Sequence, residues 1–173
     1  MKFNYEDIPN NVFNNWQKIV NLIAELIDVP AALIMRVNSP MIEVFNASDS
    51  SENPFNVKDE YLLAGVYCEE VINKKKKLLV PNALKDLRWN NNPDLEFDMI
   101  SYLGYPLIKP DGDVFGTICV SDTRERHFSK KHENILEEFK KIIENQMENI
   151  YLKNKLQTMN ELTHSTLNSL TAN

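Results

Sequence analysis

Two isolated cysteines, Cys68 and Cys119, are the side chains of this chain best suited to covalent chemistry. A thiolate is a nucleophile, a redox group and a metal ligand, so a cysteine pair raises the possibility of a thiol-based redox enzyme or sensor. Glu69 and Glu70 follow Cys68 and are expected to raise the pKa of its thiol. This argues that the cysteines are reduced core residues, and the redox role is kept as the alternative.

Other catalytic and metal-binding patterns are missing from the sequence. Two separate cysteines and three scattered histidines do not have the spacing of a zinc site, so we expect no metal. The four glycines are isolated, which excludes a glycine-rich phosphate loop, and there is no serine nucleophile elbow. His164 lacks the neighbours of a phospho-accepting histidine. We therefore expect no catalytic residues and a protein that is not itself an enzyme.

The composition is that of one globular domain with an extension. Hydrophobic residues make up 43% and charged residues 25% of 173 positions. The formal net charge of −6 argues against nucleic acid as a partner, because that requires a basic surface. The sequence has no signal peptide and no apolar run near 18 residues, so we expect a cytoplasmic protein without a membrane partner.

Hydrophobic spacing predicts the order of helices and strands that must position these side chains. We expect helices over 9–27 and 58–73, strands over 31–37, 41–48, 78–80, 101–109 and 114–122, and a long helix from residue 130 onward. The last two strands are joined by a Pro-Asp-Gly-Asp turn at 110–113. Residues 82–98 form a long irregular segment, which is typical of functional loops.

This order predicts an α+β fold around one central antiparallel sheet of about five to six strands. The N- and C-terminal helices are expected on one face, and the middle helix and the 82–98 loop on the other. A sheet covered in this way tends to enclose a pocket under the loop. We expect a lead-in at 1–8, a globular domain at 9–150 and a projecting helix at 151–173.

Several aromatic and polar side chains fall on elements expected to line that pocket. Tyr and Trp offer a planar ligand an apolar face and one hydrogen-bonding tip, although they are equally common in plain cores. Thr117 and Cys119 share one face of their strand. The candidate ligand-binding residues are Tyr67, Cys68, Asn82, Trp89, Met99, Tyr102, Tyr105, Thr117 and Cys119.

The last helix is too long for the domain that it leaves. About 33 residues span roughly 50 Å, whereas a body of this size is about 35–40 Å across. The apolar positions expected to form a parallel dimer seam, with a stutter in the heptad spacing, are Phe139, Ile143, Met147, Ile150, Leu152, Leu156 and Met159. The alternative is that residues 130–150 merely pack on the sheet and that the remainder is disordered.

Four sequence blocks, in order and with fitting gaps, resemble the GAF domain family, whose fold is related to PAS domains. They are YCEEVI (67–72), LLVPNA (78–83), ISYLGYPL (100–107) and DG (111–112) followed by FGTICVSD (115–122), and the likeness covers about residues 12–150. The resemblance implies a sensory domain, usually dimeric, that controls an effector such as a histidine kinase or diguanylate cyclase, here through a C-terminal coiled-coil helix.

The resemblance also bears on cofactors. Bilin-binding members usually have a His after the cysteine at the position of Cys68, and this chain has none, so no covalent bilin and no haem are expected. Free methionine sulfoxide reductases of this family use cysteines in a covering loop, and residues 82–98 contain none. Asp122 matches a recurrent acidic position and is expected to accept backbone N–H bonds at a turn. The small-molecule ligand is left open.

Overall fold

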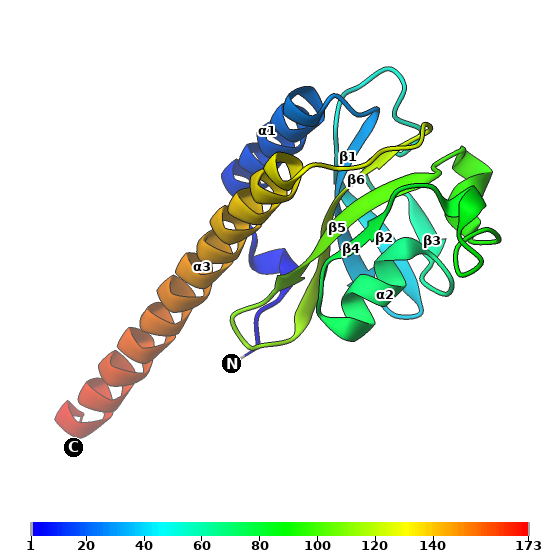
Figure 1. Cartoon of the computed structure of the whole chain (residues 1–173). Helices are drawn as coiled ribbons and strands as arrows, with labels where there is room; N and C mark the ends of the chain where they lie inside the picture. The colour runs from blue at the N-terminus through cyan, green and yellow to red at the C-terminus, as the bar shows by residue number, and fades with distance from the viewer. Residues whose placement is uncertain (1, 173) are drawn as a thin grey trace.

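The computed structural model describes residues 2–172 and has the α+β fold expected from the sequence (Figure 1). The helices and strands are α1 (Asn10–Ile27), β1 (Ala31–Asn38), β2 (Met41–Ala47), β3 (Glu60–Leu62), α2 (Tyr67–Lys74), β4 (Leu78–Val80), β5 (Ser101–Ile108), β6 (Val114–Asp122) and α3 (Lys130–Thr171). Short 3₁₀ turns lie at Tyr5–Asp7, Ala83–Lys85 and Pro93–Phe97.

The six strands form one antiparallel sheet in the order β3-β2-β1-β6-β5-β4. The central strands β1 and β6 are buried over most of their length, which explains their nearly continuous apolar sequences. Cys119 pairs with Leu33 of β1 on one side and with Gly104 of β5 on the other. Successive side chains of each strand point to opposite faces, so every strand contributes to two different layers.

One face of the sheet is covered by α1 and the first half of α3 (Figure 1). Trp16 and Ile23 of α1 are fully buried there against Leu136 and Ile143 of α3. Their regular spacing follows from the amphipathic pattern of both helices. Phe45 and Phe115 contact the Trp16 ring at centroid distances of 5.8 and 5.9 Å, which completes a filled hydrophobic layer.

The opposite face is covered by α2 and by the irregular segments around it (Figure 1). The prediction of one helix over 58–73 is wrong for the first half of that range. Residues 60–62 instead form β3, which pairs with β2, and α2 begins only at Tyr67. Gly65 separates the two elements with a φ of +86°, a conformation that L side chains rarely adopt. Apolar residues at 62, 63, 66 and 67 imitated helical spacing across this break.

Helix α3 is capped by Ser129, whose side chain accepts a hydrogen bond from the backbone N of His132 at 3.3 Å. It contains 42 residues, so it is about 63 Å long and projects away from the domain (Figure 1). Leu152, Leu156 and Met159 are exposed on the projecting part by 50%, 60% and 56%. Among the helices of residues 2–172, none is long and apolar enough to cross a membrane.

The first part of the expected dimer seam has another role in the structure. Ile143 and Met147 are fully buried in the core of their own domain, and Phe139 and Ile150 pack against that core. These four residues face the sheet and α1 because their 4-4-3 spacing continues the inward face of α3. Of the seven predicted seam residues, Leu152, Leu156 and Met159 lie beyond these core contacts and are exposed.

Candidate functional site

A cavity of about 440 Å³ lies on the α2 face of the sheet, within the size range of small-molecule pockets. Its walls come from β1, β2, β5 and β6, from residues 55–68 and from the Pro93–Phe97 turn. The lining residues are Leu33, Met35, Ile42, Phe55, Tyr61, Leu62, Ala64, Val66, Cys68, Pro93, Asp94, Glu96, Phe97, Tyr102, Cys119 and Ser121. The pocket is therefore mostly apolar.

The two cysteines meet at this pocket. The Thr117 hydroxyl lies 3.3 Å from Cys68 Sγ and 3.8 Å from Cys119 Sγ, and the Tyr102 hydroxyl lies 3.4 Å from Cys68 Sγ. All four side chains are buried. The sheet brings Thr117 and Cys119 to the same face, as expected from their spacing, and α2 places Cys68 above them.

Hydrogen bonding and burial set the proton affinities of this group. A hydrogen bond from Cys119 lowers the pKa of the Cys68 thiol, while that bond and burial leave the pKa of Cys119 well above its usual value. Burial likewise raises the pKa of Tyr102. The expectation that Glu69 and Glu70 raise the pKa of Cys68 is wrong, because the buried contact with Cys119 outweighs more distant charges.

Gly104 makes room for the Tyr102 ring. A Cβ atom built at Gly104 would lie 2.1 Å from the Tyr102 hydroxyl oxygen, far inside van der Waals contact. The Tyr102 ring therefore lies along its own strand and over Gly104, with its hydroxyl beside Cys68. Tyr67 stacks on Tyr102 at a centroid distance of 4.8 Å and extends this buried aromatic layer.

Asp94 is the principal polar group of the pocket wall. Its Oδ2 atom accepts a hydrogen bond from the backbone N of Tyr67, the first residue of α2, at 2.9 Å. Val66 precedes this helix and supplies no side-chain cap, so Asp94 takes that role from a distant loop. Burial raises the pKa of Asp94 to about 6, since loss of water disfavours its charged form.

Three aromatic rings line the same pocket as Asp94. Phe55, Tyr61 and Phe97 contact one another pairwise at centroid distances of 5.0 to 5.9 Å, in edge-to-face or tilted arrangements. The Tyr61 hydroxyl donates a hydrogen bond to Asp59 Oδ2 at 3.2 Å. Burial, together with the Asp59 carboxylate, raises the pKa of Tyr61 to about 12.

The structure separates the nine candidate ligand-binding residues into three groups. Cys68, Tyr102 and Cys119 line the pocket. Tyr67, Trp89, Met99 and Thr117 are buried behind its lining, with the Tyr67 hydroxyl donating to the Met99 carbonyl at 2.9 Å. The remaining two, Tyr105 and Asn82, lie elsewhere.

Tyr105 does not lie at the pocket. It belongs to the hydrophobic layer under α1 and α3, where burial and the nearby Glu133 and Glu137 raise its pKa to about 12. Tyr102 and Tyr105 are separated by three positions of one strand, so they must point to opposite faces. Asn82 instead caps the Ala83–Lys85 turn and donates to Glu125 at 3.0 Å.

The sequence interpretation missed Asp94, Phe55, Tyr61 and Phe97. Tyr61 lies on the strand that was taken for a helix, and Phe55 lies in a segment interpreted as a plain loop. The position of Asp94 in the Asn-Pro-Asp sequence at 92–94 is a turn signal, but its contact with a helix 27 residues earlier has no local signature.

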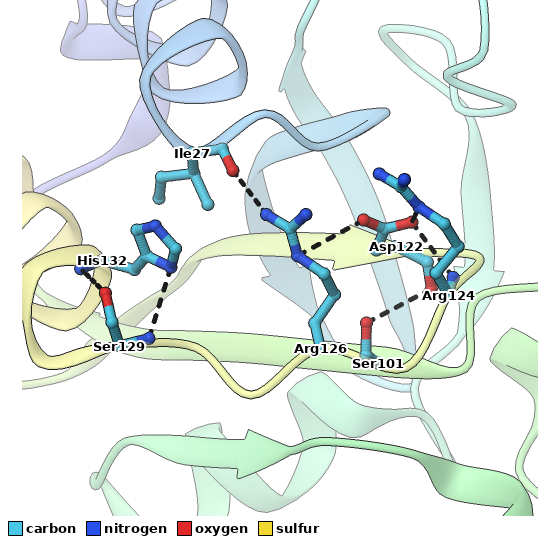
Figure 2. Close-up of polar contacts among 7 residues, drawn as sticks. All are labelled: Ile27, Ser101, Asp122, Arg124, Arg126, Ser129 and His132. Carbon is cyan, nitrogen blue, oxygen red and sulfur yellow. Dashed lines mark hydrogen bonds and ion pairs between the residues drawn. The ribbon is translucent and has the colours of Figure 1, made fainter.

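A polar cluster at the end of β6 joins the sheet to α3 (Figure 2). Asp122 Oδ1 accepts a hydrogen bond from the backbone N of Arg124 at 3.1 Å, which confirms the expected turn role of Asp122. Arg126 Nε lies 3.6 Å from Asp122 Oδ2, and Arg126 Nη2 donates to the Ile27 carbonyl at 2.5 Å. Arg126 thus ties the C-terminal end of α1 to the strand that leads into α3.

Such a fold, with helices on one side of the sheet and a pocket on the other, defines a small ligand-binding module. The family model of the GAF domain matches residues 15–147, and the chain therefore belongs to the GAF domain family. GAF domains are generally regulatory sensors. A comparison with curated proteins finds no match.

Solved structures with the same fold have diverse functions. The GAF domain of a phosphoenolpyruvate-protein phosphotransferase from Acinetobacter is 17% identical, with a TM-score of 0.65 over 83% of this chain and 85% of that chain. The blue-light absorbing form of the PixJ GAF domain of Thermosynechococcus elongatus is 12% identical, with a TM-score of 0.66 over 94% of this chain and 98% of that chain. The free methionine-R-sulfoxide reductase of Neisseria meningitidis is 15% identical, with a TM-score of 0.65 over 82% and 80%.

Proposed function

We propose that this GAF domain is a non-catalytic sensor that binds a small molecule in the α2-side pocket. Its α3 helix would relay occupancy to an effector such as a histidine kinase or diguanylate cyclase. The observation that carries the proposal is the position of β5 and β6, which contribute residues to the pocket on one face and to the α3 contact on the other. A ligand that moves these strands would change how α3 packs.

Direct polar contacts connect α3 to the rest of the domain and would transmit such a movement. Glu144 accepts a hydrogen bond from the backbone N of Ile108 in β5 at 2.8 Å. Gln146 accepts one from Trp16 Nε1 of α1 at 2.6 Å. Ligand binding would have to favour one of two packing arrangements of α3 for a signal to result.

Native mass spectrometry of freshly purified protein, followed by thermal shifts across a metabolite panel, tests ligand binding. A bound small molecule, or a compound that raises Tm and fails to do so in a pocket-blocked variant such as Ala64→Trp, would support the proposal. A protein that carries nothing and responds to no compound would instead be a structural dimerisation module.

The relay also requires a dimer through the projecting part of α3. Replacing Leu152, Leu156 and Met159 by Gln removes the exposed residues of the predicted seam without touching the domain core. Sedimentation equilibrium should show a dimer for the unmodified chain and a monomer for this variant. The matched control replaces Asn154, Thr158 and Glu161 by Gln on the outer side of the helix and should remain dimeric.

A thiol redox role is the second candidate, and the shared contact of Cys68 and Cys119 with Thr117 favours it. Two thiols could reduce a sulfoxide: they would lose two electrons and two protons, form a disulfide, and yield the sulfide and water. Incubation with free methionine sulfoxide and dithiothreitol tests this role. Turnover that disappears in the Cys68→Ser, Cys119→Ser variant would establish it and overturn the non-catalytic assignment.

A further inference from the structure

We propose that the pocket selects a small organic cation, with an apolar body and one ammonium group directed at Asp94. This inference rests on the proposed function, because it names the chemical class of ligand for the same pocket. It concerns Asp94, Glu96 and the aromatic wall of Phe55, Tyr61 and Phe97, which the cysteine-centred reasoning does not involve.

The first argument is the charge of the residues that line the cavity. Among the described residues 2–172, the charged side chains that line the cavity are Asp94 and Glu96, both carboxylates, and no Lys, Arg or His lines it. A ligand with a phosphate or carboxylate group would enter this negative, partly desolvated space without a counter-charge. The lining therefore disfavours nucleotides and organic acids.

The second argument is the way in which the Asp94 carboxylate is held. Its Oδ2 atom is fixed by the backbone N of Tyr67 at 2.9 Å, which holds the carboxylate at the pocket wall. A carboxylate has about four acceptor positions, so one bond to Tyr67 leaves capacity for donors of a ligand. An ammonium group would also offset the burial that raises the pKa of Asp94 to about 6.

The third argument is the group of aromatic rings that line the pocket. Phe55, Tyr61 and Phe97 meet at centroid distances of 5.0 to 5.9 Å and line the same cavity as the two carboxylates. Aromatic faces attract cations through the ring quadrupole, and they pack equally well on the apolar body of a ligand. Aromatic rings and carboxylates without a basic residue are the groups that recognise ammonium compounds.

Three probes with the same ring system test this selectivity at pH 7: 2-naphthylmethylamine, 2-naphthalenemethanol and 2-naphthoate. Calorimetric titration of the full chain should give the amine about ten-fold higher affinity than the alcohol, and no binding of the naphthoate. Equal affinity for the amine and the alcohol, or binding of the naphthoate, would overturn the cation class while leaving the pocket as a ligand site.

Substituting each carboxylate in turn tests whether Asp94 is the group that recognises the amine. Asp94→Asn retains an oxygen that can accept the Tyr67 N–H, so α2 stays capped, and the amine should bind only as well as the alcohol. Glu96→Gln, on the more exposed side of the turn, should weaken the amine less. The control Glu138→Gln removes an equal charge from the exposed surface of α3 and should change neither affinity.

The remaining outcomes separate the cation proposal from the proposed function. An unchanged preference for the amine in Asp94→Asn, with Tm showing a folded protein, would mean that Asp94 does not recognise the cation. Failure of all three probes also overturns the cation class. Ligand binding itself is then decided by the metabolite panel with its Ala64→Trp control.

Discussion

The two faces of the sheet differ in how they are filled. The face under α1 and α3 is packed with large aliphatic and aromatic side chains, whereas the face under α2 keeps a cavity of about 440 Å³ between its strands and irregular segments. Long amphipathic helices present regular rows of side chains that fill space well. Short turns do not, and the difference suggests that one face holds the domain together while the other is free to accept a ligand.

The largest expected effect compares two aliphatic truncations, one on each face. Ile143→Ala, under α3, should lower the free energy of unfolding by about 3–4 kcal/mol, because it opens a cavity in a filled layer. Leu33→Ala, in the pocket lining, should cost only about 2 kcal/mol, since part of its surface already borders empty volume. Urea denaturation measures both. Equal costs would contradict the contrast between a filled and a hollow face.

The second effect concerns the close approach of Tyr102 to Gly104. Gly104→Ala should destabilise the protein by about 2 kcal/mol, because the new Cβ displaces the Tyr102 ring from its place beside Cys68. In the Tyr102→Leu background the same substitution should cost clearly less, as double-mutant cycles detect for residues in contact. Additive costs in urea denaturation would show that the two positions do not interact.

The third effect tests the connection between the helices and the sheet at Asp122. Arg126→Ala should cost about 1.5–2 kcal/mol, because it removes a bond to the Ile27 carbonyl and leaves the buried Asp122 carboxylate with weaker pairing. Arg124→Ala is the matched control: its side chain is 67% exposed, against 20% for Arg126, and should cost less than about 0.5 kcal/mol. Thermal unfolding measures both, and similar losses would argue against the bridging role of Arg126.

The smallest effect is the pH dependence due to Asp94. Its pKa is about 6 in the folded protein and about 3.9 in an unfolded chain, so the unfolded state releases this proton first. The contribution of Asp94 to stability is therefore full below about pH 3.9 and is lost as the pH rises through about 6. Relative to the unmodified chain, Asp94→Asn should gain on the order of 1 kcal/mol between pH 4 and pH 7. A flat difference in urea denaturation would contradict the raised pKa.

The sequence allowed the fold to be predicted more fully than the site. Long periodic segments such as α1, β1, β6 and α3 have strong hydrophobic patterns, and the family resemblance pointed to the same arrangement. The three-residue strand β3 has too few positions for a pattern of its own, and its apolar residues merged with those before α2. Gly65 was the available signal for that break.

The pocket depends on contacts between distant segments, which explains the incomplete prediction. Tyr105 was placed at the pocket although strict alternation along β5 assigns it to the opposite face from Tyr102. Asp94 could not be found by local pattern, because its role follows from docking of the Pro93–Phe97 turn on the start of α2. The inward position of Ile143 and Met147 likewise depended on where α3 lies against the sheet.

The length of α3 gives it mechanical leverage. Its last contacts with the hydrophobic layer involve Ile150 and Tyr151, and the part from Leu152 to Thr171 extends about 30 Å farther. A tilt of about 5° at that point would displace the tip by roughly 2.6 Å, half the pitch of a helical turn. A side-chain-sized adjustment where α3 leaves the domain would thereby become a movement of about half a helical turn at its far end.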